Sequence, residues 1–210
     1  KTPLTMIKAY AEMVRDISYK DKEKRNKDLN VIIDEADRLN ILVNDLLDLS
    51  KLQANTTGLS ITHYDLVEEV KNVLSRYDII KETENYHFIL ELPEKAEVHA
   101  DKNKINQVIY NLINNAINYT GKNKKVTIRV TEKNKSYLVE IIDTGKGIKC
   151  DDLPYIWDKY YKNEKNHKRN VVGTGVGLSI VRNILETHKF KYGVSSKKNK
   201  GTTFYFEVVK

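Results

Sequence analysis

Apolar residues recur three and four positions apart through the first quarter of the chain, which is the spacing of one helical face. They predict a first helix over residues 2–18, with apolar positions at Leu4, Ile7, Ala11 and Val14. The charged stretch 19–27 is interpreted as a turn. A second helix of about thirty residues is expected to follow, because a heptad stripe runs through Leu29, Ile32, Ala36, Leu39, Val43 and Leu46.

The stripe of the second helix is broader than one hairpin can cover, since further apolar positions widen it at Leu42, Leu47 and Leu49. Two hairpins are therefore expected to pair into a four-helix bundle, which predicts a homodimer through residues 1–54. The alternative is that the hairpin docks onto the rest of the same chain. Turn-forming residues at 55–58 mark the predicted domain boundary.

The pattern over residues 59–210 is mixed, which predicts a second domain. Helical spacing is seen at 65–81, in a long segment that Asp101 can cap, and at 178–187. Alternating or apolar runs predict strands at 59–62, 87–92, 126–130, 137–142 and 202–209. The fold class is therefore α+β: a dimeric helical hairpin, then an α/β sandwich with helices on one face of a mixed sheet.

Composition and charge limit the classes of protein and ligand that the chain can represent. The chain has 36 Lys+Arg against 29 Asp+Glu, a net charge of +7, and one cysteine, so no intrachain disulfide framework is expected. No run approaches the length of a membrane span. The basic excess is concentrated in residues 159–200, which contain eleven basic side chains and two acidic ones. A solvated basic face, a nucleic acid and a bound polyphosphate are the three interpretations of that excess.

Three glycines at alternate positions lead into an apolar, helix-forming segment within residues 172–181. Glycine lets the backbone approach a ligand, and the first N–H groups of the following helix attract an anion. By itself this pattern is weak, because ordinary tight turns contain the same spacing.

Two further patterns carry polar chemistry. Asn111, Asn115, Asn118 and Tyr119 share one stripe of the helix after Asp101, and an asparagine amide oxygen can complete a magnesium shell that phosphates and water share. The alternative is a cluster of surface asparagines. Asp143 leaves a strand into a glycine-rich turn, where its carboxylate either supports that turn or accepts a hydrogen bond from the exocyclic amine of adenine.

In chain order, the segments 111–120, 143–147, 156–161, 173–178 and 201–204 resemble the N, G1, F, G2 and G3 boxes of sensor histidine kinases. Residues 1–4, Lys-Thr-Pro-Leu, look like the end of that family's H box, His-Glu-Leu-Lys-Thr-Pro-Leu. The resemblance covers essentially the whole chain. It implies a helical dimerisation and phosphoacceptor domain, then an ATP-binding domain of the gyrase and histidine-kinase superfamily.

The resemblance also implies roles for single residues. Asn115 would hold Mg²⁺, Asp143 would bind the adenine amine of ATP, and Tyr119 and Ile148 would line the ring. The glycines of 173–178 would form a hinge and phosphate cradle below a lid with cations at Lys162, Lys165, Lys168 and Arg169. The full set of expected nucleotide-binding residues is Asn115, Tyr119, Asp143, Gly145, Gly147, Ile148, Lys162, Gly173, Thr174, Gly175, Val176, Gly177, Leu178 and Thr203.

One position separates a kinase from a hydrolase within this superfamily. Gyrase-like ATPases carry a glutamate four residues before the magnesium asparagine, where it acts as a base on water; here the position is Asn111, which cannot accept a proton at neutral pH. We therefore expect a histidine kinase. An ATP hydrolase and, from another class, a basic nucleic-acid-binding module are the alternatives.

The departures from the family pattern are informative. Asn118 stands where many members have lysine, and Lys189 replaces a glycine often found after the histidine of the last helix, which predicts a local change in its C-cap. None of the five histidines, His63, His87, His99, His167 and His188, lies in an H-box context, so the phosphoacceptor is expected upstream of Lys1. Thr2 would then position water for dephosphorylation of the regulator.

The resemblance finally implies partners and a location. The phosphoryl group would pass from histidine to an aspartate in the receiver domain of a response regulator. No nucleic-acid partner is expected. The chain would be the cytoplasmic portion of a membrane-anchored sensor, attached only through an upstream segment.

Overall fold

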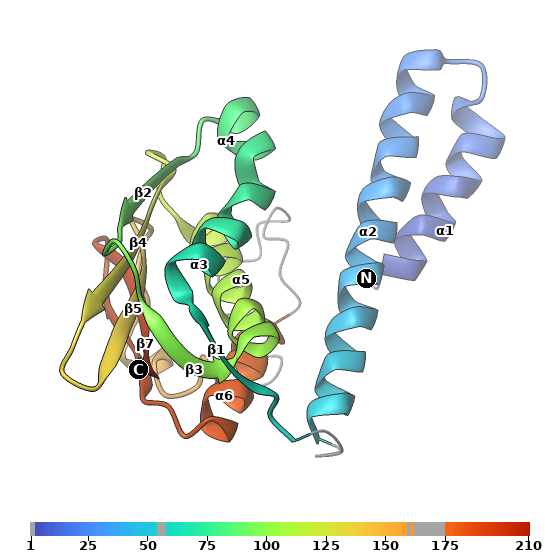
Figure 1. Cartoon of the computed structure of the whole chain (residues 1–210). Helices are drawn as coiled ribbons and strands as arrows, with labels where there is room; N and C mark the ends of the chain where they lie inside the picture. The colour runs from blue at the N-terminus through green and yellow to red at the C-terminus, as the bar shows by residue number, and fades with distance from the viewer. Residues whose placement is uncertain (1–2, 54–57, 159–160, 162–174) are drawn as a thin grey trace. The chain divides into compact units, whose positions relative to one another are not determined.

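The computed structural model describes residues 3–53, 58–158, 161 and 175–210, and its chain divides into two compact units, Lys1–Gln53 and Ala54–Lys210. Figure 1 shows the first unit as a helical hairpin and the second as a sheet with helices. Several residues expected to act in catalysis or nucleotide binding lie outside the described residues: Thr2, Gly173, Thr174 and the lid cations Lys162, Lys165, Lys168 and Arg169. Among the described residues, no helix combines the length and apolar character that a membrane span requires.

The hairpin consists of α1 (Pro3–Met13), the π-helical segment η1 (Val14–Ser18) and α2 (Lys22–Gln53). The predicted turn at 19–27 is too long, because α2 already begins at Lys22. The reason is a cap: the Asp21 carboxylate accepts hydrogen bonds from the backbone N–H groups of Glu23 (3.1 Å) and Lys24 (3.0 Å). A charged sequence thus continues as the exposed first turns of a helix.

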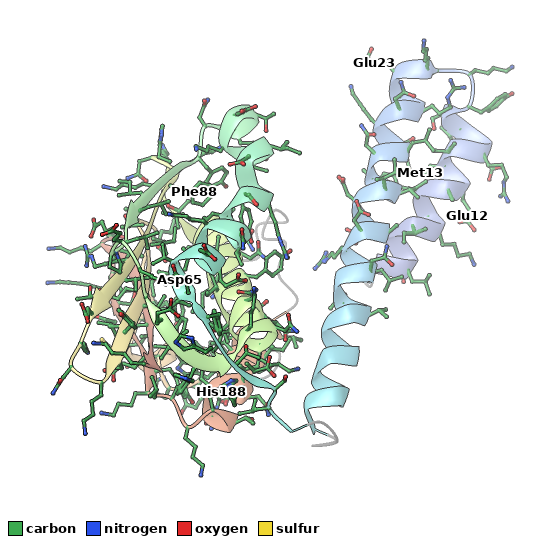
Figure 2. The ribbon with its side chains drawn as sticks, in the orientation of Figure 1. Glu12, Met13, Glu23, Asp65, Phe88 and His188 are labelled. Atoms are coloured by element: carbon green, nitrogen blue, oxygen red, sulfur yellow. The ribbon has the colours of Figure 1, made fainter. Side chains whose placement is uncertain are left out.

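A buried polar pair joins the two helices near their connection. Ser18 is fully buried and Asp28 is 6% exposed, and the Ser18 hydroxyl donates to Asp28 Oδ2 over 2.8 Å. Figure 2 shows Met13 between the helices and Glu12 pointing away from α2. Apart from this seam the hairpin leaves apolar surface open: α1 has no buried residue, and the side chains of Leu4 and Ile33 are 65% and 56% exposed.

The described residues of the second unit form two sheets. The small one pairs β1 (Ile61–Asp65) antiparallel with β3 (Glu97–Asp101). The larger one has the order β2-β4-β5-β7-β6, in which β2 and β4 are parallel and the other pairs antiparallel. Its strands are β2 (His87–Glu91), β4 (Lys125–Glu132), β5 (Ser136–Asp143), β6 (Tyr192–Lys197) and β7 (Gly201–Val209).

The helices of this unit cover one face of the larger sheet (Figure 1). They are α3 (Leu66–Leu74), α4 (Asp78–Glu84), α5 (Lys102–Tyr119) and α6 (Gly177–Thr187), with short 3₁₀ turns η2 (Ser75–Tyr77) and η3 (Cys150–Asp152). The predicted α+β class with helices on one face of a mixed sheet is confirmed. The single helix predicted over 65–81 is instead α3 and α4, separated by η2.

The core forms where the alternating side chains of the central strands meet α5. Asp101 caps α5 as expected, because its side chain accepts from the Lys104 N–H over 3.1 Å. Burying a large aliphatic or aromatic side chain stabilises the fold by about 1.5–3 kcal/mol. The buried core includes Ile105, Ile109, Leu112, Ile113, Val126, Ile128, Val139, Ile141, Phe204, Phe206 and Val208.

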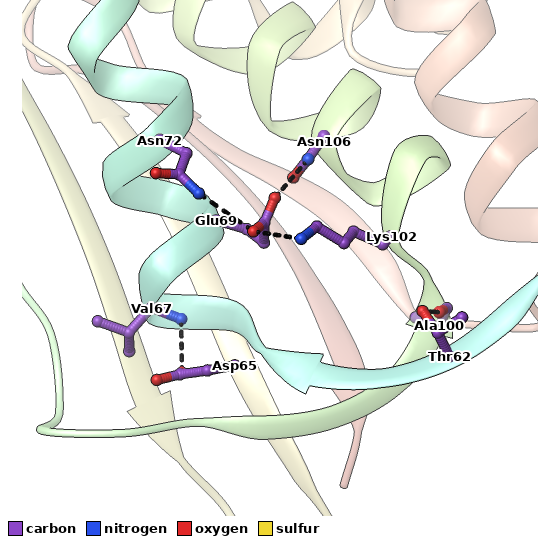
Figure 3. Close-up of polar contacts among 8 residues, drawn as sticks. All are labelled: Thr62, Asp65, Val67, Glu69, Asn72, Ala100, Lys102 and Asn106. Atoms are coloured by element: carbon purple, nitrogen blue, oxygen red, sulfur yellow. Dashed lines mark hydrogen bonds and ion pairs between the residues drawn. The ribbon is translucent and has the colours of Figure 1, made fainter.

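A buried carboxylate fastens α3 to α5 (Figure 3). Glu69 accepts hydrogen bonds from the Asn106 amide (2.6 Å) and the Asn72 amide (3.2 Å), and pairs with Lys102 Nζ at 2.9 Å. Burial by itself would raise the pKa of the Glu69 carboxyl, but these hydrogen bonds outweigh it and hold the pKa below its usual range. A buried, fully hydrogen-bonded Glu69 carboxylate therefore links α3 to α5.

Candidate functional site

Asp143 is the last residue of β5 and lies on the strand's buried face, with 4% of its surface exposed. Its Oδ1 accepts the backbone N–H of Gly145 over 2.7 Å, and Thr202 on the neighbouring strand β7 places its N–H and its hydroxyl near the carboxylate. Burial raises the pKa of the Asp143 carboxyl, and the hydrogen bonds from Gly145 and Thr202 offset part of that rise. The site thus holds a desolvated carboxylate in a fixed orientation.

The loop after Asp143 depends on glycine at two positions. A Cβ at Gly145 would collide with the backbone oxygen of Tyr119, and a Cβ at Gly147, where φ is +68°, would collide with the backbone oxygen of Lys197. The loop therefore lies directly against the end of α5 on one side and the end of β6 on the other. Only glycine permits both approaches.

The turn between β6 and β7 supports the same loop. The Asn199 N–H donates to the Lys146 carbonyl over 2.7 Å, and the Ile148 N–H donates to the Ser196 hydroxyl over 2.7 Å. The Ser196 hydroxyl is also 3.1 Å from that of Thr202. Ile148, expected beside the adenine ring, is thus anchored through its backbone to the strand pair that carries Thr202.

Helix α5 brings Asn111 next to the start of α6. A Cβ built on Gly177, the first residue of α6, would lie 3.4 Å from Asn111 Oδ1. Val176, which precedes the helix, has no polar side chain with which to cap it, and Gly175 has φ +77°. The positive end of the α6 dipole therefore lies beside an amide that can bind polar groups.

Three further polar residues near the end of α5 differ in their exposure and contacts. Asn114 is occupied within the fold, because its Oδ1 accepts from the Tyr77 hydroxyl over 2.9 Å. Asn115 is partly exposed, and Tyr119, at the end of the helix, is 55% exposed. Within the described ranges, no three His, Cys, Asp or Glu side chains are grouped so as to hold a metal ion.

Sequence reasoning selected Thr203 for this site, but the threonine that contacts Asp143 is Thr202. Thr203 lies opposite Ile142 and on the other face of β7, whereas Thr202 is buried together with Phe204. Side chains two apart on a strand share a face, so the apolar Phe204 was the signal that could have identified Thr202. Leu178 follows Gly177 within the first turn of α6 and is partly buried.

Comparison with known families places both units. Residues 100–210 match the family model described as histidine kinase-, DNA gyrase B- and HSP90-like ATPase, which is more than half of the chain. Residues 1–55 match the His Kinase A (phospho-acceptor) domain.

Individual relatives agree. The signal transduction histidine-protein kinase ArlS of Staphylococcus aureus strain USA300 is 32% identical over 206 residues, which is 97% of this chain and 45% of ArlS. The chain therefore spans less than half the length of the curated relatives it matches.

Solved structures show the same similarity. The histidine kinase AdeS of Acinetobacter baumannii matches with a TM-score of 0.75 at 25% identity, over 99% of this chain and 95% of AdeS. The histidine kinase ThkA, in complex with the response regulator protein TrrA, matches with a TM-score of 0.81 at 27% identity, over 99% of this chain and 57% of the ThkA chain. The chain therefore belongs to the sensor histidine kinases of two-component systems, within the histidine kinase-, DNA gyrase B- and HSP90-like ATPase family.

Proposed function

We propose that this chain is the kinase core of a two-component sensor, which binds Mg·ATP and transfers the γ-phosphoryl group to a histidine and then to an aspartate of a response regulator. The observation that carries the proposal is the buried carboxylate of Asp143, fixed by Gly145 and Thr202 at the end of a central strand. A carboxylate oxygen there can accept a hydrogen bond from an exocyclic amine. This chemistry selects adenine over guanine, which presents a carbonyl at the corresponding position.

The glycines on either side of the loop support the same assignment. Because Gly145 and Gly147 have no side chains, the loop packs directly against Tyr119 and Lys197, which fixes the segment between Asp143 and Ile148 that a flat adenine ring would lie against. Tyr119 is exposed enough to lie against such a ring. Gly175, Val176 and Gly177 lead into the N-terminus of α6, where phosphate oxygens would meet the positive end of a helix.

Magnesium fits the donors that α5 offers. The amide oxygen of Asn115 is a neutral, hard ligand that could hold the ion together with phosphate oxygens and water. A bound Mg²⁺ would neutralise charge on the β- and γ-phosphates. Asn111, next to Gly177, would orient polar groups but cannot take a proton from water at neutral pH, which favours transfer to a nucleophilic imidazole over hydrolysis.

The exposed apolar residues of the hairpin support a homodimer through residues 1–54. Leu4, Ile17 and Ile33 are each more than half exposed, and burying such side chains is the usual driving force of a four-helix bundle. Light scattering should find a dimer of the whole chain and a monomer after residues 1–58 are removed. A dimeric truncated domain would contradict this assembly.

A receiver domain is the proposed downstream partner. The complex of ThkA with the response regulator protein TrrA supports it, since the whole of this chain is similar to the kinase in that complex. We also propose that this portion acts in the cytoplasm as part of a membrane-anchored sensor.

Phosphotransfer is tested with radiolabelled ATP and the chain joined to a complete H box. The label should be lost in acid and persist in base, as phosphohistidine requires, and it should pass to a receiver domain. Asn115→Ala should abolish the transfer while circular dichroism shows an unchanged fold. Thr2→Ala should reduce dephosphorylation of the regulator more than kinase activity. Unchanged labelling of Asn115→Ala would refute the magnesium role.

A further inference from the structure

The two sides of the proposed adenine site come from separate elements. Tyr119 is the last residue of α5, and Asp143 is the last residue of β5. A threonine follows each of them directly: Thr120 follows Tyr119, and Thr144 follows Asp143. The hydroxyl oxygens of these two partly buried threonines lie 3.1 Å apart. The residues next to the two proposed adenine contacts are therefore joined by a direct contact between side chains.

Asn123, in the turn between α5 and β4, extends this contact. The Thr144 hydroxyl donates to Asn123 Oδ1 over 2.5 Å, and the Thr120 hydroxyl donates to the Lys125 carbonyl over 2.9 Å. The Lys125 N–H also donates to Asn123 Oδ1, over 3.4 Å. Thr120, Asn123 and Thr144, here called the hydroxyl cluster, thus link the end of α5 and the start of β4 to the loop after β5.

The backbone on both sides of Thr144 lies against the end of α5. A Cβ at Gly121 would be 2.6 Å from the Thr144 carbonyl oxygen, and a Cβ at Gly145 would be 1.9 Å from that of Tyr119. Such close packing sets how near the loop and the helix end can come. Van der Waals contact has no preferred direction, whereas a hydrogen bond weakens steeply as its angle changes. The hydroxyl cluster therefore adds the directional restraint that packing does not supply.

Proton accounting shows why the Thr144 hydroxyl is the central member of the cluster. Each hydroxyl carries one proton. Thr144 gives its proton to Asn123 Oδ1, the shortest contact of the cluster, and its oxygen can then accept the proton of Thr120. Removing this one hydroxyl takes the nearest donor from Asn123 and an acceptor from Thr120. The loop then loses both of these links to the end of α5 at once.

We propose that Thr144, held by Thr120 and Asn123, is a positioning residue that orients the Asp143 carboxylate toward the exocyclic amine of adenine. This inference rests on the proposed function, which assigns Asp143 to the amine and Tyr119 to the ring. A carboxylate accepts from an amine only within a narrow range of distance and angle. A shift of the loop by about 0.5 Å is enough to weaken that hydrogen bond.

The test compares two ligands that differ only at the amine: ATP, and purine riboside triphosphate, which lacks it. Calorimetry measures both with the whole chain and with Thr144→Val, which keeps the branched shape and removes the hydroxyl. ATP affinity should fall by about fivefold or more, and affinity for the analogue should change by less than about twofold. An equal loss for both ligands, or no loss for either, would overturn the positioning role.

Conservative and matched variants sharpen this result. Thr144→Ser keeps the hydroxyl and should bind ATP within about twofold of the wild type. The control is Thr83→Val on α4, which removes a hydroxyl that donates to the Ile79 carbonyl over 2.8 Å and should leave ATP affinity unchanged. A loss in Thr83→Val as large as that in Thr144→Val would overturn the inference. Circular dichroism melts verify that each variant is folded.

Failure of this inference can be distinguished from failure of the proposed function. A folded wild-type chain that binds no ATP would refute the proposed function, and the positioning role with it. A wild-type chain that binds ATP more tightly than the analogue, together with an unchanged Thr144→Val, would leave the proposed function standing. Only the role of Thr144 would then be overturned.

Discussion

The two units of the chain place their apolar side chains in opposite environments. In the second unit, Phe206 and Ile109 are fully buried within one sheet-and-helix core. In the hairpin, α1 has no buried residue and Ile33 is 56% exposed, while the buried residues among the side chains that the structure describes are Ser18 and Asp28. One unit is complete within a single chain, and the other has an apolar surface that a second chain can cover. The comparison shows that a strong apolar stripe predicts a helix but does not predict which surface packs against it.

The largest expected effect tests this contrast directly. Phe206→Ala should destabilise the second unit by about 3–5 kcal/mol, because it opens a cavity in a close-packed core. Ile33→Ala should leave that unit's stability unchanged and lower the melting temperature of the hairpin in a concentration-dependent way.

Chemical denaturation measures the loss of stability in Phe206→Ala, and thermal denaturation at two protein concentrations measures the effect of Ile33→Ala. If Ile33→Ala destabilised the chain equally at every concentration, the exposed apolar side chain of Ile33 would be covered within one chain, and the proposed dimer would lose its main support.

The central elements were predictable because their sequence patterns are strong. Helix α5 and strands β4, β5 and β7 lie where periodicity predicted them. Strands β3 and β6 were missed: the first offers only Val98 and Ala100 as buried apolar residues, and the second contains Gly193 and two serines. Both depend on pairing with a neighbouring strand, which a local pattern does not contain.

The candidate site shows the same limit. Asp143 was assigned to adenine because residues 143–147 resemble the G1 box, whereas the local pattern alone left open whether its carboxylate only supports the turn. Its partner Thr202, and the approach of Asn111 to Gly177, come from segments far away in the sequence. Contacts of that kind depend on sheet order and helix packing. Sequence patterns therefore identified the site residues of α5 and of the loop after Asp143, but not the residues that these contact.

The next prediction concerns the buried charge of the second unit. Asp143→Ala should weaken ATP binding by about 1.5–3 kcal/mol, because it removes a charged hydrogen-bond acceptor. Asp143→Asn is the matched variant: its amide oxygen keeps the bond to the Gly145 N–H, but the other end of the side chain becomes a donor and should repel the adenine amine. Calorimetry with ATP and GTP measures both. Unchanged ATP affinity in Asp143→Asn would remove the assignment.

Lowering the pH should weaken ATP binding in the same way as replacing Asp143. Since burial raises the pKa of the Asp143 carboxyl, protonation begins at a higher pH than for an exposed aspartate. The carboxylate form, which accepts from adenine, is present above the raised pKa and is lost as the pH falls through it. ATP affinity should therefore decline on acidification in the wild type, while Asp143→Asn shows no such step.

The hairpin's buried polar pair should matter less but remain measurable. Ser18→Ala leaves an Asp28 oxygen without its hydroxyl donor at a site with 6% exposure, which should cost about 1–3 kcal/mol of hairpin stability. Arg15→Ala, which removes an exposed ion pair with Asp16, is the control and should change little. Hydrogen exchange of the hairpin amides would distinguish the two variants, and equal protection in both would show that the buried pair contributes nothing.

The smallest effect should be a gain in stability. Lys189 follows α6 and has φ +58°. The C-terminal end of this helix has the Schellman pattern, because the Phe190 N–H donates to the Leu185 carbonyl over 2.9 Å and the Lys189 N–H donates to the Glu186 carbonyl over 3.0 Å. A residue with a Cβ is strained in this left-handed conformation and glycine is not. Lys189→Gly should therefore stabilise the second unit by about 0.5–1 kcal/mol in urea denaturation, whereas Lys189→Ala, which keeps the Cβ, should give no gain. If both variants gained equally, the benefit would come from removing a positive charge in a basic region, and the backbone at position 189 would carry no strain.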